Sequence, residues 1–234
     1  MREIIFDTET TGLKPEDGER VIEIGAVEFI NRMPSGRNFH RYINPAGRKV
    51  DPGAFAVHGI SNEQLADKPT FAEIADEFLE FIDDANLVAH NAPFDINFLN
   101  HEFARLGQPS IAPERVVDTL DIARRKHPMA QNSLDRLCER YNIDNRHRTL
   151  HGALLDAQLL AEVYIELLGG RQVSLELTVE SGPEPENALP AEDLSGAALK
   201  RPSPLPPRLS EADKSTHREF VETLGDDAIW NRYA

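Results

Sequence analysis

The hydrophobic pattern along the chain changes its period from two to about 3.6 near Thr70. Before that point, β-branched and alternating apolar residues predict strands joined by turns that contain Gly, Pro and Asn. The expected strands are residues 3–7, 21–30 and 38–43. After it, apolar residues recur at helical spacing from Phe71 to Ile82, behind a Thr70–Glu73 capping box. The pattern therefore predicts a three-stranded meander followed by an amphipathic helix.

Short apolar runs and helical patterns then alternate as far as residue 170. The further elements are expected at residues 87–90 (strand), 94–106 (helix), 116–118 (strand), 133–141 (helix) and 152–168 (helix). Pro93 suits the first turn of one of these helices, and Gly107 its end. The Gly169–Gly170 pair stops the last helix. This order of elements predicts an α/β fold with a mixed β-sheet flanked by helices.

A proline-rich stretch separates this compact domain, residues 1–170, from the end of the chain. Seven prolines fall between Pro183 and Pro207, with few large apolar residues among them. Such a composition cannot form a core. We therefore expect a flexible C-terminal tail, with a linker at residues 181–208 and a separate segment at residues 209–234.

Composition and charge narrow the class of protein. The 234 residues are 28% charged, and no apolar run approaches the ~20 residues of a membrane span, so we expect neither membrane insertion nor Sec export. The single cysteine, Cys138, cannot form an internal disulfide, which fits a protein of the reducing cytoplasm. The net charge of −15 has the wrong sign for holding nucleic acid by phosphate neutralisation alone. Nucleic-acid chemistry would need divalent cations or a basic partner.

Acidic residues stand where several of the predicted elements begin or end. Asp7 and Glu9 are two apart on a strand and share a face, which favours a cation between them over an ordinary solvated strand end. Asp95 falls in a first helical turn, where helix capping alone would explain it. Asp156 lies among leucines, which calls for a partner. His151 is five residues earlier, ~140° round an ideal helix, so we expect it in the turn just ahead, facing the mouth of a site.

Taken together, three segments resemble the DEDD family of 3′→5′ exonucleases in their order and placement. They are Asp7-Thr8-Glu9, His90-Asn91-Ala92-Pro93-Phe94-Asp95 and His151-Gly152-Ala153-Leu154-Leu155-Asp156. The last resembles the histidine branch of the family. The resemblance covers most of residues 1–170 and implies a ribonuclease H-like fold. It also implies two divalent cations, Mg²⁺ or Mn²⁺, bound by Asp7, Glu9, Asp95 and Asp156, with His151 as general base.

Elementary chemistry supports these residue types. Two hard cations about 3.5–4 Å apart can stabilise both the attacking and the leaving oxygen of a phosphodiester. Mg²⁺ prefers oxygen ligands, and a neutral imidazole with a pKa of about 6.5 can accept a proton from water. A lone histidine is more often a surface or capping residue, so the assignment of His151 to the site depends on its occurrence together with the other motifs.

Residues 50–60 and 68–71 further resemble the proofreading members of this family, which serve bacterial replicative DNA polymerases. This closer resemblance implies contacts with the 3′-terminal nucleotide from Asp7, Glu9, Thr10, His58 and Asp156. For Thr10, a local hydrogen bond in the turn explains the residue equally well. A weak, metal-dependent grip on a frayed 3′ end of DNA fits the acidic charge, because the polymerase itself would hold the DNA.

A first candidate docking element lies in residues 171–180. Gln172, Leu175 and Leu177 form a Gln-x-x-Leu-x-Leu sequence, which resembles the sliding-clamp motif of bacterial replication proteins. The motif is short, and an edge strand of the domain would explain the same alternation of apolar residues equally well. Its position between the last domain helix and the linker favours the clamp slightly.

A second candidate docking element follows the linker. Ser210 can cap a helix that contains Phe220 and ends at Gly225, and Trp230 follows it. So short a segment cannot bury Phe220 and Trp230 itself, so we expect a partner surface, with folding back onto the domain as the alternative. The resemblance implies that this partner is the catalytic (alpha) subunit of the polymerase. It also allows a small theta-type subunit.

Two other functions compete with proofreading. An RNA-trimming 3′→5′ exoribonuclease would use the same active site, but it needs neither the linker nor the Trp230 segment. A binding module without activity is disfavoured because all four acids and His151 are present. Mismatched DNA compared directly with short RNA as a substrate separates the first two.

Overall fold

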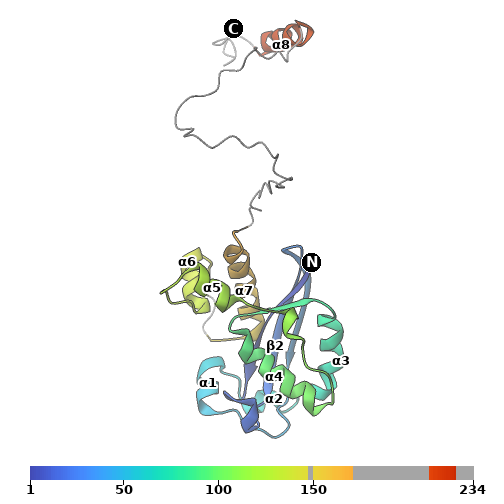
Figure 1. Ribbon diagram of the computed structural model, residues 1–234, viewed down its shortest axis with the longest axis vertical. Helices are drawn as coiled ribbons and strands as arrows, with labels where there is room; N and C mark the ends of the chain where they lie inside the picture. Colours follow the sequence, from blue (N-terminus) through green and yellow to red (C-terminus); the bar gives the residue numbers. More distant parts are fainter. Residues whose placement is uncertain (147–149, 171–210, 225–234) are drawn as a thin grey trace, which may run out of the picture. The chain divides into compact units, whose positions relative to one another are not determined.

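The computed structural model describes residues 1–146, 150–170 and 211–224 (Figure 1). Its first unit is built on a five-stranded sheet of order β3-β2-β1-β4-β5. The strands are β1 (Arg2–Thr10), β2 (Val21–Ile30), β3 (Met33–Tyr42), β4 (Asn86–Ala89) and β5 (Val116–Asp118). The first three form the predicted antiparallel meander, and β4 and β5 run parallel to β1. The predicted mixed α/β sheet is confirmed.

Four helices of this unit match the prediction to within two residues at each end. They are α3 (Phe71–Ile82), α4 (Ala92–Arg105), α6 (Leu134–Tyr141) and α7 (Ala153–Leu167). The Glu73 carboxylate accepts hydrogen bonds from the Thr70 backbone N–H at 2.7 Å and hydroxyl at 2.8 Å, as the capping box requires. Three further helices were not predicted: α1 (Pro52–His58), α2 (Asn62–Leu65) and α5 (Thr119–Lys126).

Strand β3 begins five residues earlier than predicted. The hairpin turn is made by Asn31 and Arg32, whose φ angles are 52° and 65°. Positive φ at two consecutive residues matches the twist of a β-hairpin. Pro34 and Gly36, which resemble turn residues in the sequence, therefore lie within β3 at the edge of the sheet, where Pro is tolerated.

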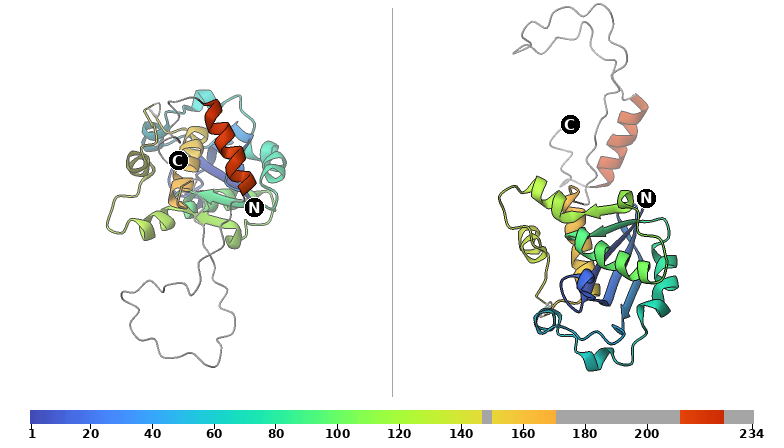
Figure 2. Two further views of the ribbon diagram at one scale, coloured as in Figure 1. Left: turned by 90° about the horizontal axis from the view of Figure 1, so that it is seen from above. Right: turned by 60° about the horizontal axis from the view of Figure 1, so that its bottom comes forward.

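Helices cover both faces of the sheet (Figures 1 and 2). Ile4 and Phe6 of β1 pack in the core with α3 and α4, whereas Ile5 packs in the core with α6 and α7. Because side chains alternate along a strand, Asp7 and Glu9 share the face of Ile5. The sheet thus directs both acids toward α7.

The C-terminal unit is described by α8 (Glu211–Thr223), a helix that starts directly after Ser210 as predicted. Gly169 and Gly170 end α7 with φ angles of 106° and 78°, in agreement with the predicted helix stop. None of the helices in the described ranges is long and apolar enough to cross a bilayer.

Candidate active site

The end of β1 and the start of α7 bring three of the predicted residues together. Ligand atoms of Glu9, His151 and Asp156 all lie within 4.8 Å of one another. His151 Nδ1 is 3.3 Å from the Asp156 carboxylate, and His151 lies just ahead of α7, as expected. Glu9 and Asp156 are buried, whereas the His151 side chain is 45% exposed. The acids thus form the floor of a site and the imidazole stands at its mouth.

Asp95 enters from the opposite side of the sheet, on α4. Its Oδ1 accepts hydrogen bonds from the Thr8 backbone N–H at 3.1 Å and from the Thr8 hydroxyl at 2.6 Å. Thr8 separates Asp7 from Glu9 along β1. Asp95 therefore lies directly against the segment of β1 that carries Asp7 and Glu9. The fourth predicted acid, Asp156, approaches Glu9 from α7.

Burial raises the pKa of the Asp95 carboxyl group to about 7, against the opposing hydrogen bonds from Thr8. The nearby Asp118 carboxylate contributes to the increase. A bound cation would offset this cost of holding a buried carboxylate in its charged form. The donor set consists mainly of carboxylate oxygens, which fits a hard divalent cation.

Gly25 allows α7 to approach the sheet closely at this site. It pairs with Asp7 across β1 and β2. A Cβ atom at Gly25 would lie 2.1 Å from the Leu154 backbone nitrogen and 2.2 Å from the Ala153 carbonyl carbon. Only glycine fits this contact between two backbones. The approach of α7 to Glu9 therefore depends on glycine at position 25.

Asp118 and Thr119 hold the loop that leads to Asp95, and the sequence analysis did not single them out. Asp118 Oδ1 accepts hydrogen bonds from the Asn91 N–H at 3.0 Å and the Leu120 N–H at 2.9 Å. Asn91 adopts the left-handed conformation, with φ of 62°. The Thr119 hydroxyl lies 2.9 Å from His90 Nδ1. An Asp-Thr pair at the end of a short strand was the available signal, since Asp is a preferred N-cap residue.

His58 is buried beside the site with one ring nitrogen satisfied. Its Nδ1 accepts a hydrogen bond from the Ile60 N–H at 3.0 Å, so Nε2 carries the proton of the neutral ring. Nε2 has no hydrogen-bond partner among the described residues. Burial lowers the pKa of His58, an interaction with the Thr10 backbone opposes this decrease, and the proximity of His151 adds to it. An unpaired buried donor costs about 1–3 kcal/mol, so a polar atom of a ligand is its natural partner.

Thr10 adopts the local role that the sequence left open. Its hydroxyl donates a hydrogen bond to the Gly12 carbonyl at 2.6 Å and is buried. This contact shapes the turn after β1. The loop of His151 is tied to the other side of the site, because its backbone N–H donates to the Val57 carbonyl at 3.2 Å.

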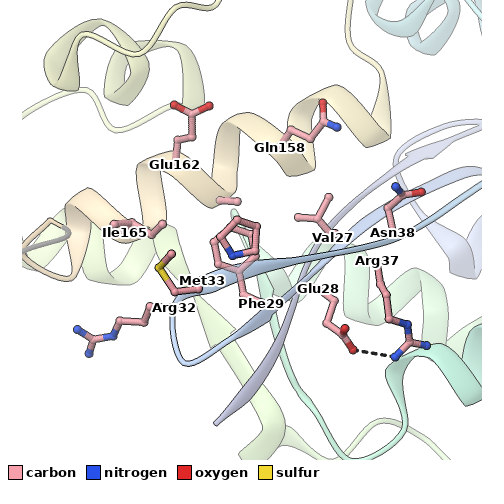
Figure 3. A pocket seen from close by; sticks show the side chains of 13 residues that line it. Val27, Glu28, Phe29, Arg32, Met33, Arg37, Asn38, Gln158, Glu162 and Ile165 are labelled. Atoms are coloured by element: carbon pink, nitrogen blue, oxygen red, sulfur yellow. Dashed lines mark hydrogen bonds and ion pairs between the residues drawn. The ribbon is translucent and has the colours of Figure 1, made fainter.

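A groove of about 590 Å³ lies elsewhere, between the β2–β3 hairpin and the later turns of α7 (Figure 3). Phe29 and Met33 line it from the hairpin, and Gln158, Glu162 and Ile165 line it from α7. The four acids and His151 are not among its lining residues. This groove is therefore distinct from the candidate active site.

The predicted docking residues are mostly outside the described ranges. Gln172, Leu175, Leu177 and Trp230 all lie there. Phe220 is on α8 and is 59% exposed. That exposure is what a docking residue requires, although exposed apolar side chains are common.

Comparisons with known proteins give a consistent picture. The sequence model of the exonuclease family RNase_T matches residues 4–164. DNA polymerase III subunit epsilon of Rickettsia felis is 48% identical over 227 residues, which cover 96% of this chain and 97% of that protein. The subunit of the same name from Escherichia coli is 53% identical over 186 residues, 76% of each chain.

Solved structures agree with this fold. Exonuclease X in complex with 5′ overhanging duplex DNA matches with a TM-score of 0.55 and 26% identity, covering 72% of this chain and 90% of that chain. The nuclease domain of 3′hExo, a DEDDh family member bound to rAMP, matches with a TM-score of 0.60 and 19% identity, covering 72% and 92%. The second likeness concerns the fold alone.

Proposed function

This chain belongs to the RNase_T family of exonucleases, and from that membership we propose that it removes mispaired 3′-terminal nucleotides from DNA as the proofreading subunit of DNA polymerase III. It is a metal-dependent 3′→5′ exonuclease, and the expected products are nucleoside 5′-monophosphates. The observation that carries the proposal is the convergence of Glu9, His151 and Asp156, whose ligand atoms lie within 4.8 Å of one another, beside the Thr8–Asp95 contact.

In this proposal the four acids bind the cations and the histidine accepts a proton. Asp7, Glu9, Asp95 and Asp156 would hold Mg²⁺ or Mn²⁺, which would supply Lewis-acid stabilisation of charge on the phosphodiester oxygens. His151 accepts the proton of the attacking water. Its position 3.3 Å from the Asp156 carboxylate orients the ring. The exposure of His151 gives water and the DNA end access to it.

Substrate contacts come from the rim of the site. We assign the His58 Nε2–H as a donor to a polar atom of the terminal nucleotide, because this buried group has no partner among the described residues. Thr10, whose side chain bonds Gly12, contributes through the turn that it shapes. Asp7, Glu9 and Asp156 would act on the scissile phosphate as residues that hold the cations.

The partners follow from the relatives, which carry the name of a polymerase III subunit over 96% of this chain. We propose that residues 209–234, with Phe220 and Trp230, bind the catalytic alpha subunit. Gln172, Leu175 and Leu177 are proposed to bind the sliding clamp, and a small theta-type subunit is a further candidate partner. The work of such an enzyme belongs in the bacterial cytoplasm, where the chromosome is copied.

A primer-extension substrate with either a paired or a mispaired 3′ end tests the proofreading activity. Wild type should release the mispaired terminal nucleotide faster than the paired one, and from the 3′ end alone, as 3′- and 5′-labelled primers would show. Asp7→Ala should be inactive on both. Faster degradation of short RNA than of mispaired DNA would favour the RNA-trimming alternative instead.

Binding of the alpha subunit is a separate test. A fragment ending at Gly170 should retain normal turnover on single-stranded 3′ ends, because every proposed ligand precedes that residue, but it should no longer bind. Trp230→Ala in the full chain should weaken the complex by ~2 kcal/mol, as buried Trp anchors often do. Lys214→Ala, on the exposed surface of α8, is the control. Unchanged affinity in both the fragment and Trp230→Ala would refute docking through the tail.

A further inference from the structure

Glu23 is a buried acid on β2 that belongs to none of the predicted motifs. It is 2% exposed and lies directly opposite Glu9 across the β1–β2 pair. Opposed residues of an antiparallel pair share a face, with Cβ atoms about 4.5–5.5 Å apart. Two carboxylates placed in this way repel each other unless each has a separate partner. The position of Glu23 next to a proposed metal ligand therefore needs an explanation.

The partners of Glu23 include the first residue of α7 and, on β3, a histidine and Tyr42. One carboxylate oxygen accepts a hydrogen bond from the Ala153 backbone N–H at 3.2 Å. The other lies 2.7 Å from His40 Nε2. The first N–H groups of a helix have no partner inside the helix, and they favour a negative charge. Glu23 thus caps α7 across a sequence separation of 130 residues.

Helix α7 has no capping side chain of its own. Its N-cap residue is Gly152, which has no side chain and makes no capping hydrogen bond. The usual N-cap residues would supply an oxygen from that position themselves. The Glu23 carboxylate supplies it from the sheet instead, so the start of the helix is fixed relative to β2.

This contact controls the segment that carries two site residues. Ala153 follows His151 by two residues and precedes Asp156 by three. Gly25, two residues along β2 from Glu23, lets the same turn of α7 lie directly on the strand. Farther along, α7 leaves room for the groove of Figure 3 between itself and the hairpin. The N-terminal turn is therefore the part of α7 that β2 locates most closely.

We propose that Glu23 is a positioning residue of the metal site. By capping α7 it sets the positions of Asp156 and His151 relative to Glu9, and it does so without ligating a cation. Both of its carboxylate oxygens are engaged, by Ala153 and by His40. The inference rests on the proposed metal-dependent function.

The test compares Glu23→Ala and Glu23→Gln with Glu3→Gln in the full chain. Glu3 is a matched control because it is 3% exposed and also bonds α7, through the Tyr164 hydroxyl at 2.8 Å, but far from Asp156 along the helix. Mn²⁺ affinity is measured by calorimetry without DNA, together with the melting temperature and the kcat and KM of nucleotide release. Asp156→Ala serves as the reference for loss of a ligand.

We expect Glu23→Ala to weaken Mn²⁺ binding by about 10–100-fold, the range typical of residues that orient metal ligands, and to lower kcat with little change in KM. Glu23→Gln should restore part of the loss, because its amide oxygen can still accept from Ala153. Glu3→Gln should lower the melting temperature but keep Mn²⁺ affinity within about twofold of wild type, since Tyr164 is remote from the ligands.

Three results would overturn the inference. The first is Mn²⁺ affinity within about twofold of wild type in Glu23→Ala while Asp156→Ala loses binding; this leaves the proposed function standing. The second is a loss of Mn²⁺ affinity in Glu3→Gln as large as that in Glu23→Ala, when both variants lower the melting temperature equally. The third is wild type that binds no Mn²⁺, which removes the proposed metal site as well. If Glu23→Ala does not fold, unchanged affinity in Glu23→Gln overturns the inference and a clear loss supports it.

Discussion

Replacing Asp95 by Asn should stabilise the metal-free protein at neutral pH while abolishing its activity. The Asp95 side chain is 3% exposed, and burial raises its pKa to about 7. In the unfolded chain the pKa of an aspartate is about 3.9. Because the folded-state pKa is the higher one, the folded protein binds the proton more tightly than the unfolded chain. Stability is therefore lost as the pH rises from about 4 to about 7.

The magnitude follows from the difference between the two pKa values. Three pH units at ~1.36 kcal/mol each correspond to roughly 4 kcal/mol, a cost that is absent below pH ~4 and complete above pH ~7. The Asp95→Asn variant would keep the oxygen that accepts from the Thr8 N–H and hydroxyl, at 3.1 and 2.6 Å in the wild type. The substitution removes the charge and retains both hydrogen bonds, so the variant should gain up to about that amount at pH 8.

Urea unfolding in EDTA at pH 5 and pH 8 measures this effect. Asp76→Asn makes the same chemical change at an exposed position of α3 and should alter stability little at either pH. Mn²⁺ added at pH 8 should stabilise the wild type but not Asp95→Asn, because binding to the folded state alone raises stability. The reasoning is refuted if the stability difference between Asp95→Asn and wild type does not grow between pH 5 and pH 8.

Other substitutions test the remaining parts of the site. Asp156→Ala should abolish nuclease activity in Mg²⁺ yet keep a cooperative thermal melt, because it also relieves carboxylate repulsion; near-normal turnover would contradict the metal assignment. His151→Ala should lower the single-turnover rate by ~10²–10⁴-fold with little loss of Mn²⁺ affinity, and an unaltered rate–pH profile would exclude it as the base. Gly25→Ala should cost about 1–3 kcal/mol and reduce Mn²⁺ affinity, because its Cβ meets the α7 backbone at 2.1 Å; Gly53→Ala, with open space around it, is the control.

Strong periodicity explains why much of the fold could be predicted from the sequence. The apolar stripe from Phe71 to Ile82 and the β-branched runs of β1 and β2 each allow one secondary structure. The resemblance of the acidic motifs to those of the DEDD family led us to expect that Glu9, His151 and Asp156 would meet. Local pattern and global fold agree in these segments.

Short helices were missed because their signals are capping residues rather than periodicity. Helix α1 begins at Pro52 and ends at Gly59, which has φ of 70°. Helix α2 has a capping box between Ser61 and Gln64 but spans only four residues. Helix α5 has few apolar residues, so its pattern resembles that of a loop. Whether such short segments form helices depends on tertiary contacts rather than on their local sequence.

The residues that position the site could not be predicted from the sequence for a different reason. Glu23, Gly25 and Asp118 act through backbone groups far away in the sequence, as in the bond from Glu23 to Ala153. Nothing in the local pattern of β2 distinguishes Glu23 from an ordinary charged residue on a strand. Its role becomes visible once the register of β1 and β2 and the position of α7 are known.

Anomalous diffraction from crystals grown with Mn²⁺ tests the central claim most directly, because it locates the cations without relying on activity. The account predicts anomalous peaks bordered by Asp7, Glu9, Asp95 and Asp156, with His151 at the open side. Asp156→Ala crystals under the same conditions should lose at least one of them. Strong Mn²⁺ peaks elsewhere, with none at these four carboxylates, would contradict the account.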